Sequence, residues 1–106
     1  MSSEDDDTNV FKALASPIRR RMLDALKDDP KTTGALVERF PELDRCTVMQ
    51  HLAVLEAAGL VIAEKRGRER WNHLNALPIR DIHDRWIGPY AAYAVEMLSR
   101  LRGLEA

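Results

Sequence analysis

The sequence predicts a mainly α-helical fold with one small β-hairpin, and three observations predict it. Two short helical patterns in the middle of the chain are joined by a tight connection at residues 41–43. Two short segments rich in branched and aromatic residues follow, with Gly67 between them as a hairpin turn. Further helical patterns stand at both ends of the chain. This order is that of a winged helix-turn-helix, with a three-helix core, a β-hairpin wing and flanking N- and C-terminal helices.

The N-terminal segment divides into a tail and a helix. We expect a disordered acidic tail at residues 1–7, because they contain no aromatic or branched aliphatic residue and carry a run of like charge. One folded domain is then expected over residues 8–106, since the length suits a single domain. Its first helix should start at Thr8 and stop before Ser16, because the residue preceding a proline avoids the helical region. The apolar side chains of this helix are Val10, Phe11 and Leu14.

Cap residues mark the starts of the three core helices. Serine, threonine and aspartate accept hydrogen bonds from the free N–H groups of a helix's first turn. The second helix is expected to be capped by Ser16, to have Pro17 at its first position and to run to about Lys27. The caps of the third and fourth helices are Thr32 or Thr33 and Asp44, respectively.

The fourth helix is expected over residues 44–58. Val48, Leu52 and Leu55 are spaced to form its buried stripe. Gly59 is suited to end this helix in a left-handed conformation.

The wing and the C-terminal helix complete the fold. The two strands of the hairpin are expected at residues 61–65 and 69–74. From Pro78 the pattern is helical again, and the dipeptide Gly88-Pro89 should break or kink that stretch.

Composition and charge restrict the function. The net charge is −1, but four of the 17 acidic residues lie at positions 4–7, so residues 8–106 carry 16 basic and 13 acidic residues. Local positive charge matters more than total charge for binding a polyanion. No apolar run could span a membrane or serve as a signal peptide, and the single Cys46 allows no intrachain disulfide. We therefore expect a cytoplasmic protein.

The residue types of an enzyme are not assembled in this sequence. We find no glycine-rich phosphate loop, no nucleophile with an obvious base and no cluster of cysteine and histidine. The expectation is a protein that is not an enzyme and needs no cofactor.

Three stretches carry a resemblance to a known family. They are Phe11-Lys-Ala-Leu-Ala-Ser-Pro-Ile-Arg19, Cys46-Thr-Val-Met-Gln-His-Leu-Ala-Val-Leu-Glu-Ala-Ala-Gly-Leu-Val61 and Arg66-Gly-Arg68. These residues resemble the ArsR/SmtB family of bacterial repressors. The resemblance implies a homodimeric winged helix-turn-helix protein that binds double-stranded operator DNA and represses transcription. It often implies release from DNA by a metal ion or another signal.

The helix at residues 44–58 would be the recognition helix, whose N-terminal part reaches base edges. Arginine can pair with guanine and glutamine with adenine, and threonine or histidine can bond to phosphates or bases. The candidate DNA-contacting residues are Arg45, Thr47, Met49, Gln50 and His51. Met49 stands where the family usually has a small polar residue. The alternative interpretation is a solvated polar helix face.

The tip of the hairpin would be the wing. Long cations on a projecting turn can reach a flanking minor groove or the phosphates. The candidate wing residues are Lys65, Arg66, Arg68 and Arg70. A charged, solvated hairpin is the alternative, because Glu64 and Glu69 stand among them. For the basic cluster at residues 19–21 we expect a structural use of at least one arginine.

An apolar stripe runs along the terminal helices and is larger than this small domain can cover. It is either an internal packing face or an isologous two-fold interface. We favour the second, because the family dimerises through its terminal helices. The candidate dimer-interface residues are Phe11, Leu14, Trp86, Tyr90, Tyr93, Met97 and Leu101.

No metal site is expected. The third helix, where some relatives carry paired cysteines, offers no sulfur here, and the C-terminal-helix site of other relatives would need ligands where this chain has Ala94 and Met97. A lone cysteine such as Cys46 is more often a space-filler than a sensor. Two alternative functions stay open: a winged-helix module that binds only proteins, and a DNA-binding sensor of a small molecule or an oxidant.

Overall fold

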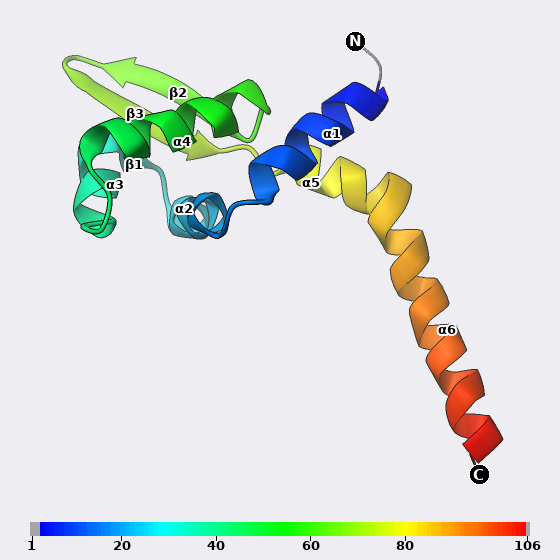
Figure 1. Cartoon of the computed structure of the whole chain (residues 1–106). Coiled ribbons are helices and arrows are strands. Elements are labelled where there is room, and N and C mark those ends of the chain that lie inside the picture. The colour runs from blue at the N-terminus through cyan, green and yellow to red at the C-terminus, as the bar shows by residue number, and fades with distance from the viewer. Residues whose placement is uncertain (1–2, 106) are drawn as a thin grey trace.

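A computed structural model describes residues 3–105, and it confirms the mainly α-helical winged-helix fold (Figure 1). The helices are α1 (Ser3–Leu14), α2 (Pro17–Asp28), α3 (Thr33–Arg39), α4 (Arg45–Ala57), α5 (Leu77–Ile82) and α6 (Gly88–Glu105). The strands are β1 (Lys31–Thr32), β2 (Val61–Arg66) and β3 (Glu69–Leu74). A π-helical turn, η1 (His83–Ile87), joins α5 to α6. No helix among the described residues is long and apolar enough to cross a membrane.

The expected helix caps are confirmed. The side chains of Ser16, Thr32 and Asp44 each accept a hydrogen bond from the backbone N–H three residues later, at 3.3, 3.1 and 2.7 Å. Gly59 follows α4 with a φ of +78°, a left-handed conformation that glycine adopts without steric cost. Local signals in the sequence therefore place the starts of α2, α3 and α4 correctly.

The core lies where α2, α3 and α4 meet, with α1 and β2 closing it. The expected stripe of α4 is fully buried, since Val48, Leu52 and Leu55 are at most 1% exposed. The other large side chains at the centre of the core are Met22, Leu36 and Leu60. Because α4 is anchored along this whole stripe, its opposite face is held in a fixed orientation toward solvent.

A third strand, which was not expected, completes the sheet. The strand order is β1-β3-β2, and both pairings are antiparallel. Buried Asn72 on β3 donates to the carbonyl oxygen of Lys31 at 3.2 Å and to the hydroxyl of Thr33 at 3.2 Å. The hairpin itself closes with Arg66 opposite Glu69. Gly67 opens its two-residue loop with a φ of +62°, the arrangement of a tight hairpin turn.

The expectation of a disordered tail at residues 1–7 is wrong for residues 3–7, which form the first turns of α1; residues 1 and 2 lie outside the described part of the chain. Two interactions explain the correction. Acidic side chains in the first turn stabilise the positive end of the helix dipole. Asp7 also forms an ion pair with Arg85 of η1, so the start of α1 is bonded to the start of the C-terminal helix.

The C-terminal helix bends without breaking. Pro89 has no N–H and its ring would collide with the carbonyl four residues earlier in a regular α-helix. The chain instead makes a π turn, in which the N–H of Gly88 bonds to the carbonyl oxygen of His83. A Cβ at Gly88 would lie 2.9 Å from that oxygen, so glycine is needed here. The helix axis bends at this turn and α6 then projects away from the core (Figure 1).

Candidate nucleic-acid interface

The N-terminal half of α4 presents four side chains to solvent. Arg45, Cys46, Met49 and Gln50 are exposed, and Met49 is exposed to 49%, unusual for a large apolar side chain. Thr47 and His51 are half-buried at the flank of the same helix. The structure therefore gathers all five candidate residues on two turns of one helix whose other face is locked into the core.

Thr47 is partly engaged by the helix cap. Its backbone N–H and its side-chain hydroxyl both donate to Asp44, and these bonds hold the pKa of that carboxyl below its ordinary value. Asp44 is thus an anion that stabilises the start of α4. The hydroxyl of Thr47 turns toward this cap, so Thr47 is less available to a ligand than Arg45 or Gln50.

His51 is bonded to a residue outside α4. Its Nδ1 lies 3.3 Å from Nη1 of Arg19, at the start of α2. Burial lowers the pKa of His51, and the positive charge of Arg19 lowers it further. The ring is therefore held neutral. Sequence reasoning missed this contact, because the two residues are 32 positions apart.

The four wing cations form two groups in the described part of the chain, one without bound partners and one held by acidic residues. Lys65 and Arg68 are exposed, and within the described residues neither side chain has a hydrogen bond or an ion pair. Arg66 instead pairs with Glu64 at 2.8 Å, and its guanidinium lies over the ring of Trp71 at 5.2 Å. The fourth cation, Arg70, is paired with an acid of α4. Two cations are thus free for a polyanion, and two maintain the shape of the wing.

Glu64 on β2 is bonded to two other side chains of the hairpin. It accepts from His73 at 3.1 Å as well as from Arg66. The bond from His73 is the main reason that the pKa of Glu64 lies below its ordinary value, and the charge of Arg66 adds to it. The negative charge of Glu64 is therefore compensated by its neighbours on the hairpin.

Of the basic cluster at the start of α2, all three arginines have structural contacts. Arg19 donates to the carbonyl oxygens of Lys12 at 3.1 Å and Ala13 at 2.8 Å, and Arg20 donates to that of Leu14. Those carbonyls belong to the last turn of α1, which cations stabilise. Arg21 pairs with Glu42 at 3.2 Å on the connection between α3 and α4. The expected structural use is confirmed.

A second, apolar surface runs along α1, η1 and α6. Phe11 contacts Trp86 edge-on with ring centroids 5.8 Å apart, and Trp86 contacts Tyr90 at 5.0 Å. Leu14 packs partly against the core of its own chain, so less of it is available to another subunit than expected. The remaining large apolar residues that are exposed or half-exposed on the described part of α6 are Tyr93, Val95, Met97, Leu98 and Leu101.

Sequence reasoning missed Val95 and Leu98, which lie on another side of α6 than the expected stripe. Val95 is 68% exposed. The expected stripe consists of apolar residues three or four positions apart, a pattern which assumes that the opposite side of the helix is polar. Helix α6 is instead apolar over most of its circumference. The signal that could have found both residues is the low number of charges between residues 86 and 98.

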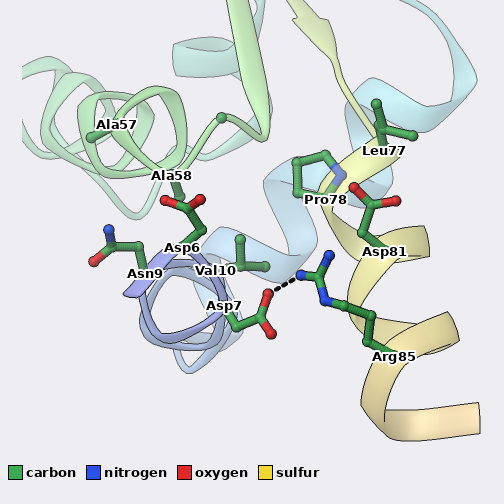
Figure 2. A pocket seen from close by; sticks show the side chains of 11 residues that line it. Asp6, Asp7, Asn9, Val10, Ala57, Ala58, Leu77, Pro78, Asp81 and Arg85 are labelled. Carbon is green, nitrogen blue, oxygen red and sulfur yellow. Dashed lines mark hydrogen bonds and ion pairs between the residues drawn. The ribbon is translucent and has the colours of Figure 1, made fainter. Parts of the chain in front are cut away.

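A cavity of about 340 Å³ lies between α1, the C-terminal end of α4 and α5. Figure 2 shows Asp6, Asp7 and Asp81 at its rim, with the ion pair between Asp7 and Arg85 across one side. Its acidic rim repels phosphates. The cavity lies at the C-terminal end of α4, whereas Arg45 is at the N-terminal end. The acidic cavity and the candidate DNA-contacting residues are therefore at opposite ends of this helix.

Within residues 3–105, no three side chains among His, Cys, Asp and Glu come close enough together to hold a metal ion. Cys46 is exposed beside Arg45, and it is free.

Comparisons with known proteins agree with this geometry. A family model described as a helix-turn-helix domain matches residues 14–62. The transcriptional repressor SdpR of Bacillus subtilis (strain 168) is 33% identical over 73 residues, covering 69% of this chain and 80% of SdpR. A solved ArsR family transcriptional regulator superposes with a TM-score of 0.72 at 26% identity, over 91% of this chain and 93% of that one. The fold is also that of an ArsR-like transcriptional regulator from Rhodococcus sp. RHA1, with a TM-score of 0.74 at 24% identity over 98% and 96% of the two chains.

Proposed function

This chain belongs to the ArsR/SmtB family of winged helix-turn-helix transcriptional regulators, and from this we propose that it represses transcription as a homodimer bound to operator DNA. Members of the family are DNA-binding regulators and not enzymes. The observation that carries the proposal is the solvent-facing half of α4, where Arg45, Met49 and Gln50 project from a helix anchored by its buried stripe.

In this proposal the N-terminal half of α4 enters the major groove. Arg45 pairs with the acceptor edge of guanine and Gln50 with adenine, because their donors and acceptors match those base edges. Met49 supplies an apolar contact of the kind that a thymine methyl group accepts. Lys65 and Arg68 of the wing bind the flanking backbone, and their charge contributes affinity without sequence preference.

The homodimer would form through the apolar surface of α1, η1 and α6. Contiguous exposed apolar residues of this extent are typical of an interaction site. A two-fold axis would place the same surface of each subunit against the other. The two α4 helices would then face half-sites about one helical turn, ~34 Å, apart on one face of the duplex.

Selection of bound duplexes from random sequence by the purified protein tests the proposal. The expected result is an inverted repeat whose half-sites are about 10 base pairs apart. Affinity for it should fall steeply as salt is raised, because counterions are released on binding.

The variant Arg102→Ala is a control for the general loss of positive charge. Its arginine is near the C-terminal end of α6, a helix that projects away from the core (Figure 1), so its loss should leave the affinity for the selected duplex unchanged. Absence of any enriched sequence, or of a salt-dependent shift, would favour the module that binds only proteins.

A further inference from the structure

Arg19 stands where three helices meet. It is the third residue of α2, and its guanidinium donates to the last turn of α1 through Nε and Nη2. The third nitrogen, Nη1, lies 3.3 Å from Nδ1 of His51 on α4. One side chain thus bonds α1 and the recognition helix at once.

The chemistry of this contact decides which nitrogen of His51 carries the proton. A guanidinium has only donors and no acceptor. Nδ1 must therefore accept from Arg19 with its lone pair. Because a neutral imidazole has one N–H, the proton of His51 resides on Nε2.

Nε2 of His51 is a donor that has no partner inside the protein. No described residue accepts a hydrogen bond from it. It is also not one of the buried unpaired polar atoms of the described chain, which are Nε of Arg70 and Oδ1 of Asn72. Nε2 is therefore accessible to solvent on the flank of α4, one turn after Thr47.

We propose that Arg19 is a positioning residue for DNA binding, which fixes His51 as the Nε2–H tautomer and so presents a fixed neutral donor to a phosphate oxygen of the duplex. The inference rests on the proposed function, because α4 must lie in the groove for His51 to reach DNA. His51 is half-buried beside the buried stripe, so it faces the side of the groove rather than its floor. Donors at such flanks bond to phosphates and set the register of the helix.

This assignment distinguishes His51 from the wing cations. A neutral donor releases no counterion when it binds a phosphate, so its loss should leave the salt dependence unchanged. It should also weaken binding to all sequences alike, because a phosphate contact carries no sequence information.

Two substitutions at His51 separate its two nitrogens. His51→Asn places an amide oxygen near the position of Nδ1, so it keeps an acceptor for Arg19 and loses the outward donor. His51→Gln reaches to the position of Nε2, so it keeps an outward donor and loses the contact with Arg19.

The substitution Arg19→Met removes the hydrogen bond between Arg19 and His51 by removing its donor. Arg20→Met is the matched control, because Arg20 also donates to the last turn of α1 but makes no contact with His51.

The first experiment is ¹⁵N NMR of the imidazole nitrogens in the DNA-free protein. The expected result is a protonated Nε2 and an unprotonated Nδ1 in the wild-type protein and in Arg20→Met, with a mixture of tautomers in Arg19→Met. A proton on Nδ1 in the wild-type protein overturns the proposal. This measurement involves no DNA, so its outcome is independent of the proposed function.

The second experiment compares affinities for the selected duplex and for a random duplex. His51→Asn should lose about three- to tenfold on both duplexes, the value of one hydrogen bond, with an unchanged salt slope. Arg19→Met should lose less than His51→Asn, because part of its His51 population still carries the proton on Nε2. The double variant should lose no more than His51→Asn alone, because the outward donor that Arg19 positions is then absent.

Arg20→Met should stay within about twofold of wild type, a loss smaller than that of one hydrogen bond. His51→Gln should lose less than His51→Asn, because it keeps an outward donor that Arg19 no longer positions. An equal loss in Arg20→Met, or additive losses in the double variant, overturns the proposal. If the wild-type protein shifts neither duplex, the proposed function fails and the DNA role of His51 fails with it, while the tautomer remains as measured.

Discussion

Nη2 of Arg70 on β3 lies 2.5 Å from Oε2 of Glu56 on α4, so the hairpin is bonded directly to α4. The pair is partly exposed, and such pairs contribute about 0.2–1 kcal/mol to stability. Its consequence is geometric, because it links β3 of the hairpin to the last turn of α4. Since Arg66 is similarly held by Glu64, the wing has two cations, Lys65 and Arg68, to offer a polyanion.

The first prediction concerns these free cations. Arg68→Ala should weaken binding to every duplex and lower the slope of log affinity against log salt by about 1, because one phosphate contact is lost. Arg66→Ala removes the same charge from the same hairpin and serves as the control, with a smaller change of slope. Fluorescence anisotropy over a salt series measures both, and an unchanged slope in Arg68→Ala would argue against a wing contact.

The second prediction concerns base recognition by α4. Arg45→Ala and Gln50→Ala should each cost about 1–3 kcal/mol on the selected duplex and relax the preference at one base position. Repeating the selection with each variant measures the preference directly. If both variants keep the affinity and the sequence preference of the wild-type protein, α4 does not contact the bases.

Dimerisation is the subject of the third prediction. The wild-type protein should sediment as a dimer at micromolar concentration, with an interface of about 1,200 Å² or more. Tyr93→Asp should shift it toward monomer, because a charge in an apolar interface is costly to bury. Arg102→Asp, on the same helix, is the control for charge alone. A monomeric wild-type protein at this concentration contradicts the prediction.

The fourth prediction is a pH dependence of stability that originates at His51. Its pKa in the folded protein lies below its ordinary value of about 6.5, because of burial and then of Arg19. Below that value the unfolded chain binds more protons at this site than the folded protein does. The contribution of His51 is therefore fully present above about pH 6.5 and is lost as pH falls toward the folded pKa.

Urea unfolding of wild type and His51→Asn between pH 7.5 and 5 measures this effect. The variant should show the weaker decline of stability with falling pH, and His83→Asn serves as the control. Asp44 and Glu64 also have lowered pKa values, but carboxyl groups titrate below this window. Parallel curves for wild type and His51→Asn would contradict the assignment.

The features that the sequence predicted are those determined by neighbouring residues. The caps at Ser16 and Asp44, the stripe of α4 and the turn at Gly67 each depend on residues within a few positions. The winged-helix order followed from them.

The missed features depend on residues far apart in the chain. Strand β1 has only two residues and pairs with Asn72 and Trp71 of β3, about 40 positions away, where the side chain of Asn72 also bonds to Lys31 and Thr33. Residues 3–7 are helical, and Asp7 meets Arg85, 78 positions later. Arg70 is held by Glu56, 14 positions earlier. No local pattern could have shown these pairings, whereas the pair of Glu64 and Arg66 lies two positions apart on one face of β2 and is local.

The attachment of α6 has a further consequence for the folding of the whole chain. The helix has 18 residues and packs mainly against η1, at its own start. Most of the stability of a helix in a protein comes from the tertiary packing of its apolar face. Its helical structure therefore depends on whatever covers its apolar surface, and in a homodimer that cover is a second copy. Folding of α6 and association would then be one equilibrium governed by mass action, so dilution should unwind α6 while the three-helix core stays folded.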